Sequence, residues 1–238
     1  MLFKRQRERR TMILQMTRPV QAGLRQERKY EVNANHLANG DTTGFKKDVL
    51  SFDSMMKANL SVNLTQGDII DTENKLDMAL FDEGFFKVET PAGVRYTRNG
   101  NFHLDNQSRI VDSLGNPVLG EAGGPLVVNG NNINVSEGGD VEVDGEIIGR
   151  LGVVTFADTR KIEKEGSGYF IYQGDQADEI PPQHILVKQG ALERSNVSVV
   201  QEMTEMIDIY RMYEAVQKMM QTFDEVDGRT INEVGKLM

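Results

Sequence analysis

The sequence predicts an α+β protein in which N- and C-terminal helices form a coiled-coil layer and the central region folds as an all-β domain. Near the C-terminus, mostly apolar side chains recur at alternating steps of four and three, the spacing of a coiled-coil seam. They are Val199, Met203, Met206, Tyr210, Tyr213, Gln217 and Met220. A less hydrophobic stripe with this spacing lies near the N-terminus, at Met16, Val20, Gly23, Glu27, Tyr30, Ala34 and Leu37. Between the stripes, short runs of β-branched and aromatic residues alternate with Gly, Asn and Asp, which is typical of short strands.

The N-terminal segment predicts a basic extension followed by a helix. Residues 1–11 carry a net charge of +4, and a short charged tail of this kind is usually solvated, so we expect it to be disordered. The first helix of the coiled-coil domain is expected within residues 12–40, with Thr17 as a candidate N-cap and Pro19 at an early position. Asn39 and Gly40 then end the helix.

Residues 41–64 predict a hinge followed by an arm. The string DTTGFKK combines turn residues with an aromatic ring and two cations, and Gly44 supplies the backbone freedom that a bend requires. Gly44 and Phe45 are therefore predicted to set the hinge. From Val49 onward the pattern fits either a short helix or an extended arm, and both stay open.

Residues 65–192 predict the β domain. Turn residues separate nearly all of its short apolar runs, and two Gly-containing pairs have the form of two-residue hairpin turns, namely Asn129-Gly130 and Asp144-Gly145. The expected strands are Leu76–Leu80, Phe85–Glu89, Val94–Thr97, Ile110–Asp112, Leu126–Val128, Ile133–Val135, Val141–Val143, Leu151–Phe156 and Tyr169–Tyr172.

Residues 193–238 predict the second helix of the coiled-coil domain. Ser195 or Asn196 is its candidate N-cap, and Glu202 places negative charge in the early turns, where it suits the helix dipole. The helix is expected to reach about Asp227, because Gly228 weakens it. An isolated helix cannot bury its apolar stripe in water. Each terminal helix therefore needs a partner, which is either the other terminal helix of this chain or a helix of another chain.

Composition narrows the class of protein. The chain carries a formal net charge of -9, and the basic extension leaves -13 for the rest, which argues against nucleic acid as the main partner. No apolar run approaches the roughly 20 residues of a transmembrane helix, so no membrane insertion is expected. The basic N-terminus lacks the apolar stretch and cleavage site of a signal peptide, so none is expected. The chain has no cysteine, which excludes disulfides and thiolate metal sites.

No constellation of side chains predicts catalysis. His36, His103 and His184 lie in three different segments, without a close-spaced set of carboxylates. Asp77 and Asp82, with Glu83, could form the paired carboxylates of a hydrolase that cleaves sugars, but strand and turn positions explain them more simply. We therefore expect no enzyme, and no catalytic, cofactor-binding or metal-binding residue.

Several strings, taken in order, resemble the flagellar basal-body rod and hook family of bacterial axial proteins. The first spans the end of the N-terminal helix and the turn after it, the next three lie in the β region, and the last leads into the C-terminal helix. They are ANHLANGDTTGFK at 34–46, TQG at 65–67, LDMAL at 76–80 running into GFF at 84–86, YTRNGNF at 96–102 and QGALERSNV at 189–197.

The resemblance implies a structural subunit of the bacterial flagellar rod. Such a subunit assembles with copies of itself and with paralogous rod proteins into a drive shaft that transmits torque. The resemblance also implies contact with the flagellar export apparatus during secretion, and a final place in the periplasmic part of the basal body. The short middle region is similar to that of proximal rod members, with a distal rod position as the alternative.

The side chains expected at the assembly interface come from both stripes. They are Val20, Leu24, Leu37, Met203, Met206, Tyr210, Tyr213 and Met220. A soluble periplasmic polymer-binding module stays open as another class of function, with the helices serving only to dimerise the β domain. The chain lacks tryptophan and is 7% aromatic, so it supplies few surfaces on which sugars could stack.

Overall fold

A computed structural model describes residues 2–53, 57–130, 132–166, 168–175, 178–182 and 184–235, with side chains from residue 20 to 226 and at 228–229 of these ranges. The chain divides into two compact units. The helical unit contains Met1–Ala38, Leu50–Asn59 and Ser198–Met238, and the β unit contains Asn39–Val49 and Leu60–Val197. The α+β class is therefore confirmed. No helix in the described part of the chain combines the length and apolar character that crossing a membrane requires.

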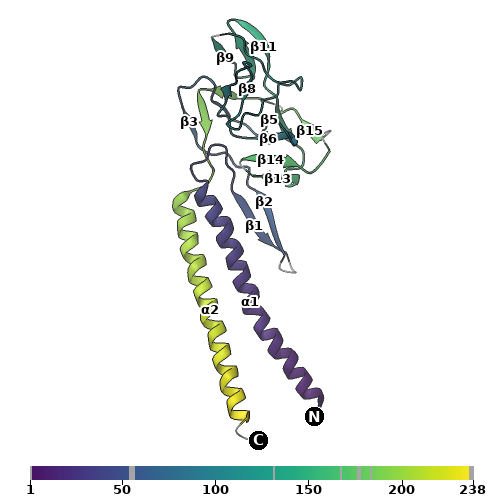
Figure 1. The fold of residues 1–238 in the computed structure, drawn as a ribbon, viewed down its shortest axis with the longest axis vertical. Coiled ribbons are helices and arrows are strands. Elements are labelled where there is room, and N and C mark those ends of the chain that lie inside the picture. Colours follow the sequence, from purple (N-terminus) through teal and green to yellow (C-terminus); the bar gives the residue numbers. More distant parts are fainter. Residues whose placement is uncertain are drawn as a thin grey trace. The chain divides into compact units, whose positions relative to one another are not determined.

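The helical unit is built on two long helices, α1 (Leu2–Ala38) and α2 (Val199–Gly235). They run antiparallel beside each other (Figure 1). Two contacts show this direction: His36, near the end of α1, contacts Glu202, near the start of α2, and Gly23, earlier in α1, lies against Val216, later in α2. Helix α1 starts well before the predicted Thr17, since residues 2–16 contain neither Gly nor Pro and are rich in good helix formers.

The predicted caps of α2 at Ser195 and Asn196 are wrong, because the helix begins only after Ser198, whose carbonyl oxygen accepts from Glu202 N–H at 2.9 Å. Ser195 Oγ instead accepts from the N–H of Val197 at 3.2 Å. Helix α2 also continues past Gly228 to Gly235, the last described residue.

The regular elements of the β unit are short strands and one 3-10 turn. In chain order they are β1 (Asp48–Phe52), β2 (Ala58–Val62), β3 (Ile69–Asp71), β4 (Met78–Leu80), β5 (Phe85–Thr90), β6 (Gly93–Thr97), β7 (His103–Leu104), β8 (Ile110–Val111), β9 (Ile133–Val135), β10 (Asp140–Val143), β11 (Glu146–Arg150), β12 (Val153–Phe156), β13 (Ile162–Glu165), β14 (Tyr169–Tyr172), β15 (Glu179–Ile180), β16 (Val187–Gln189) and β17 (Ala191–Glu193), with a 3-10 turn, η1 (Thr159–Lys161). The segment left open as helix or arm is thus the two-stranded ribbon β1–β2, whose residues 50–59 belong to the helical unit.

Among the described residues, the largest sheet has the strand order β13-β14-β6-β5-β12-β15, and a second sheet has the order β11-β10-β9. Two small antiparallel pairs, β16–β4 and β17–β3, join the last strands of the β region to its first ones. The main core is aliphatic, with Phe86 and Phe102 in edge-to-face contact at 5.2 Å between ring centroids. A smaller aromatic cluster contains Phe85, Tyr96 and Phe156.

One of the two predicted hairpin turns is correct. Asp144 and Gly145 join β10 to β11 with φ of 50° and 96°, as a two-residue turn of type I′ requires. The predicted hairpin at Asn129-Gly130 is wrong. Val127, on the segment before the turn, forms a β-bridge with Arg109, and β9, after the turn, pairs with β10. Long-range pairing overrides the local turn signal there.

Candidate functional site

A buried ionic cluster, defined by Lys46, Arg98 and Glu193, lies within the β unit. Glu193 Oε1 accepts from Lys46 Nζ at 2.5 Å and from Gly67 N–H at 2.9 Å, and its Oε2 accepts from Arg98 Nη1 at 3.3 Å. Lys46 Nζ also donates to the carbonyl oxygen of Thr65 at 2.8 Å. The three charged residues are 0%, 4% and 1% exposed respectively, so two cations share one carboxylate away from solvent.

Burial controls the electrostatics of this cluster. Desolvation lowers the pKa of Lys46 below its ordinary value, and attraction to Glu193 offsets part of that change. Desolvation likewise lowers the pKa of Arg98, against the attraction of Glu193 and of Glu83. The guanidinium also lies over the ring of Phe85, 5.6 Å from its centroid.

The strings that carry the family resemblance meet around this cluster. Lys46 comes from the first string, Gly67 from the second, Arg98 from the fourth and Glu193 from the last. The third string joins through the N–H of Met78, which donates to the oxygen of Gly100 at 3.0 Å. These strings therefore hold together parts of the β unit that are far apart along the chain.

Two glycines in these strings allow the close approach of backbone segments. A Cβ on Gly44, whose φ is +68°, would lie 2.3 Å from the nitrogen of Asn99, and one on Gly100 would lie 1.6 Å from the oxygen of Met78. The N–H of Gly44 donates to the oxygen of Glu193 at 2.8 Å, and the adjacent Phe45 is buried. The residues predicted to set a hinge thus form a tightly packed turn.

In the helical unit, polar side chains join the two helices. Glu202 Oε2 accepts from Asn33 Nδ2 at 2.8 Å and lies 3.0 Å from His36 Nδ1, and all three residues are buried. Val216 is buried farther along α2, beside Gly23. The face of α2 that contacts α1 therefore includes Glu202 and Val216, which lie beside the predicted stripe.

Most of the predicted assembly residues point away from this contact. Val20 is 50% exposed, Leu24 59%, Met203 54%, Tyr210 58% and Tyr213 39%. Leu37, Met206 and Met220 are half-buried. Their role in assembly stays a prediction.

Further apolar side chains are exposed on α2, beyond those predicted. They are Val200, Ile207, Met212, Met219, Phe223 and Val226. A helix that is apolar on several faces is normally covered by other helices. The described part of the helical unit leaves these faces uncovered.

The two carboxylates considered for hydrolysis, those of Asp77 and Asp82, have different surroundings. Asp77 is buried, and its oxygens accept from Thr72, Asn74 and Asn101 at 2.7, 3.0 and 3.0 Å. Asp82 is exposed in a different segment. Within the residues that the structure describes, no group of three His, Cys, Asp or Glu side chains could hold a metal ion.

The ionic cluster was not predicted from the sequence, because its members are far apart along the chain. The available signal was that Lys46, Arg98 and Glu193 each stand inside a string already singled out, and that these strings carry charges of both signs. A buried charge requires a partner of opposite sign.

Comparisons with known proteins agree with the resemblance. A family profile described as "Flagellar basal body rod FlgEFG protein C-terminal" matches residues 188–233, and one described as "Flagellar hook protein FlgE/F/G D1 domain" matches residues 79–155.

Whole relatives match over most of their length. The flagellar basal-body rod protein FlgF of Caulobacter vibrioides is 32% identical, over 88% of this chain and 93% of that protein. The rod protein FlgG of Bacillus subtilis is 29% identical, over 86% and 92%. The hook-basal body complex protein FlhO of the same species is 27% identical, over 91% and 96%. The chain therefore belongs to the family of flagellar basal-body rod proteins that includes FlgF and FlgG.

Proposed function

We propose that this chain is a structural subunit of the flagellar rod, which assembles with copies of itself and with related rod proteins into a shaft that transmits torque. The observation that carries this proposal is the exposed apolar surface of α2. Soluble monomers rarely expose large contiguous apolar patches, and such patches mark interfaces with other molecules. In the assembled rod, the terminal helices of neighbouring subunits would form an inner coiled-coil layer that covers α2.

The two units fit a subunit in which the helices make the assembly contacts and the β unit folds by itself. The β unit has its own aliphatic core and its own ionic cluster, so its folding does not require the apolar stripe of α2. Contacts between unlike surfaces of identical subunits produce a helical array, as a shaft needs, and not a closed dimer. Long helices aligned with the axis would resist twisting through many side-chain contacts.

A proximal position in the rod is supported by the similarity to FlgF of Caulobacter vibrioides, a distal one by the similarity to FlgG proteins. We favour the proximal position, because the highest identity among the relatives above is to a FlgF protein. The location would be the periplasmic part of the basal body, reached through the flagellar export apparatus. Quantitative mass spectrometry of purified hook-basal bodies tests the position, since a few copies per particle fit a proximal subunit and a larger number a distal one.

A substitution on the exposed stripe tests the assembly proposal. Met203→Glu places a charge on a side chain that is 54% exposed in the monomer, so it should leave the fold intact. It should prevent rod assembly, because the charge would be desolvated without a partner in the interface. Gln201→Glu adds the same charge to the same turn of α2 at an exposed polar position, and serves as the control. Normal swimming of a strain carrying Met203→Glu would contradict the proposal.

A further inference from the structure

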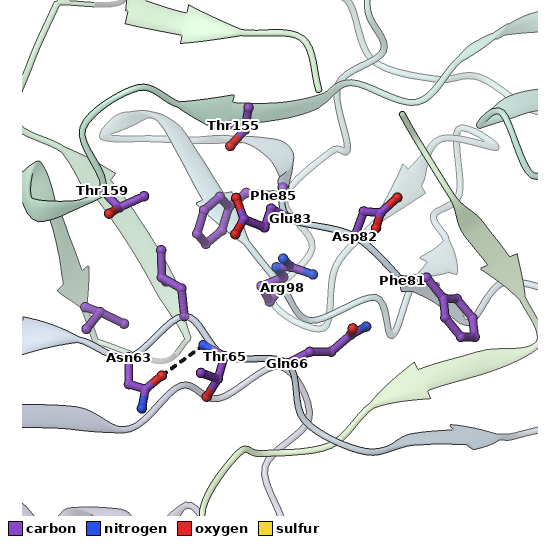
Figure 2. A pocket seen from close by; sticks show the side chains of 13 residues that line it. Asn63, Thr65, Gln66, Phe81, Asp82, Glu83, Phe85, Arg98, Thr155 and Thr159 are labelled. Atoms are coloured by element: carbon purple, nitrogen blue, oxygen red, sulfur yellow. Dashed lines mark hydrogen bonds between the residues drawn. The ribbon is translucent and has the colours of Figure 1, made fainter. Parts of the chain in front are cut away.

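The cavity in the β unit carries its own counter-charges. It has a volume of about 520 Å³, and Figure 2 shows Asp82 and Glu83 beside Arg98 among the side chains that line it. Both carboxylates attract the guanidinium of Arg98, which is also paired with Glu193. The cavity therefore needs no external ion, and side chains that are open to chemical change lie elsewhere, on α2.

Helix α2 exposes three thioethers. It contains five of the 12 methionines of the chain, namely Met203, Met206, Met212, Met219 and Met220. Of these, Met203, Met212 and Met219 are 54%, 53% and 50% exposed, whereas Met78 in the core of the β unit is 0% exposed. In the unassembled chain, these three side chains are therefore accessible to small oxidants.

The three exposed methionines lie on two sides of α2. Met212 and Met219 are seven residues apart, so they point to the same side of the helix, in one row with the exposed Val226. Met203 lies nine residues before Met212, which turns it by about 180° about the helix axis, into the stripe predicted for assembly. A change in the polarity of these side chains therefore affects both exposed apolar sides of α2.

A hydroperoxide converts a thioether to a sulfoxide without help from other side chains. The sulfur lone pair attacks one oxygen of the peroxide, an S–O bond forms and the O–O bond breaks, and the departing oxygen takes the proton of the attacked one. Sulfur loses two electrons, and the peroxide is reduced to water or to an alcohol. The product is a polar, chiral side chain, and it forms faster where the methionine is exposed.

A sulfoxide on α2 would oppose assembly. Its oxygen is a hydrogen-bond acceptor that must give up water when a neighbouring subunit covers the helix, and desolvation without a donor is unfavourable. The exposed side chains around the three methionines include Val200, Ile207, Phe223 and Val226, which offer no donor. The unoxidised thioether, in contrast, is flexible and adapts to apolar neighbours. Oxidation thus turns a side chain that favours burial into one that opposes it.

We propose that Met203, Met212 and Met219 form an oxidation site that controls assembly. A hydroperoxide converts them to sulfoxides in the unassembled chain, and the oxidised chain does not enter the rod. The inference rests on the proposed function, because the polarity of these side chains matters only when neighbours cover α2. Assembly in turn protects the three residues, since a covered thioether is out of reach of the oxidant. A methionine sulfoxide reductase restores the chain, because this class of enzyme reverses the reaction.

The first experiment tests the chemistry in the full-length monomer. Hydrogen peroxide is the probe, and peptide mass spectrometry follows the addition of one oxygen atom at each methionine. Met203, Met212 and Met219 should oxidise at least about tenfold faster than the buried Met78, because exposure controls the rate. In urea the difference should disappear. Equal rates in the folded protein would overturn the proposal.

The second experiment measures incorporation by competition within one cell. The original chain is expressed together with Met203→Leu/Met212→Leu/Met219→Leu, which lacks sulfur at the site and keeps a similar apolar volume, in a strain without methionine sulfoxide reductases. Mass spectrometry gives the ratio of the two chains in purified basal bodies. Without peroxide, this ratio should equal that of the unassembled chains. At a peroxide concentration that oxidises most of the site in the unassembled chain, the leucine variant should be enriched at least about tenfold, because sulfoxides are costly to desolvate.

Ile207→Val is the matched control, because it changes a side chain of α2 that is 54% exposed and keeps every methionine. Its ratio to the original chain should not change with peroxide. An unchanged ratio for the leucine variant as well, or equal sulfoxide fractions in basal bodies and in unassembled chains, would overturn the oxidation site and leave the proposed function standing. Absence of both the original chain and the leucine variant from basal bodies without peroxide would count against the proposed function too.

Discussion

Replacement of Glu193 by Gln would test the ionic cluster directly, since it removes the charge and keeps the shape of the side chain. Glu193 is 1% exposed and accepts from Lys46, Arg98 and the N–H of Gly67. In the variant, two buried cations lose their carboxylate, and the amide group of Gln points a donor at one of them. Removal of one partner from a buried ion pair costs roughly 3–5 kcal/mol.

The lower end of this range is expected for Glu193→Gln, because one of the cations can lose its proton. Burial already lowers the pKa of Lys46, and loss of Glu193 removes the attraction that raises it. Deprotonation of Lys46 would then relieve part of the cost. A loss of about 3 kcal/mol corresponds to a fall of roughly 6–12 °C in Tm for a domain of this size.

The sign of the pH dependence follows from the direction of the shift. The pKa of Lys46 in the folded state lies below its unfolded value of 10.5, so the unfolded state binds more protons between the two values. The contribution of Lys46 to stability therefore rises as the pH increases through its folded pKa. In Glu193→Gln this pKa is lower still, so the deficit relative to the original protein should shrink as the pH rises from the folded-state pKa of Lys46 in the variant toward that in the original protein.

Urea unfolding of the full chain at pH 7, followed by near-ultraviolet circular dichroism of its 6 tyrosines, measures the effect. Glu165→Gln is the matched control, because Glu165 pairs with Arg95 on the surface and its side chain is 47% exposed. The control should keep the urea midpoint of the original protein, since exposed pairs contribute little. Equal midpoints for Glu193→Gln and Glu165→Gln would refute the reasoning that the cluster stabilises the β unit.

Three further predictions concern other parts of the molecule. Gly100→Ala should destabilise the β unit by more than about 3 kcal/mol or prevent its folding, because the new Cβ would lie 1.6 Å from a backbone oxygen of β4. The control is Gly124→Ala, whose new Cβ would have no heavy atom within 4 Å, so this variant should unfold at nearly the original urea concentration. Glu202→Ala should weaken the pairing of α1 with α2 by about 1–3 kcal/mol, since two buried side chains lose their acceptor, and faster hydrogen exchange at the adjoining ends of both helices would show it. Burial and a hydrogen bond to a carboxylate raise the pKa of Tyr96 and of Tyr169 above 10.0, so their contribution to folding stability is complete below pH 10 and is lost as the pH rises toward the folded-state pKa values. The double variant Tyr96→Phe/Tyr169→Phe should therefore lose less of its urea midpoint than the original protein as the pH rises above 10. An unchanged dependence of the urea midpoint on pH would contradict this prediction.

Local sequence patterns predict much of the β unit. The predicted strands Ile133–Val135 and Tyr169–Tyr172 coincide with β9 and β14, because β-branched and aromatic residues favour a half-buried pleated surface. The turn at Asp144-Gly145 is also correct. Several other strands are polar or only two or three residues long, as in β15, and they form because distant partners are available. A sequence pattern carries little information about such partners.

The helical unit shows a different limit. Periodicity indicates a helix with an apolar stripe, but it does not specify which face of the helix meets which neighbour. Glu202 and Val216 face α1, while Met203 and Tyr210 are exposed. A helix that is apolar on several faces is consistent with more than one partner.

The backbone hydrogen bond from Gly44 to Glu193 has a consequence for how proteins of this family can diverge. It brings together the points at which the chain enters and leaves the β unit, and the ion pair between Asp41 and Arg194, at 2.8 Å, lies next to it. A segment whose ends are fixed side by side can be lengthened at little extra entropic cost, since loop-closure entropy grows slowly with length. Residues 47–192 thus form an insertion between two fixed ends. Segments of different length could occupy this place in evolution, while Gly44 and Glu193 keep their hydrogen bond.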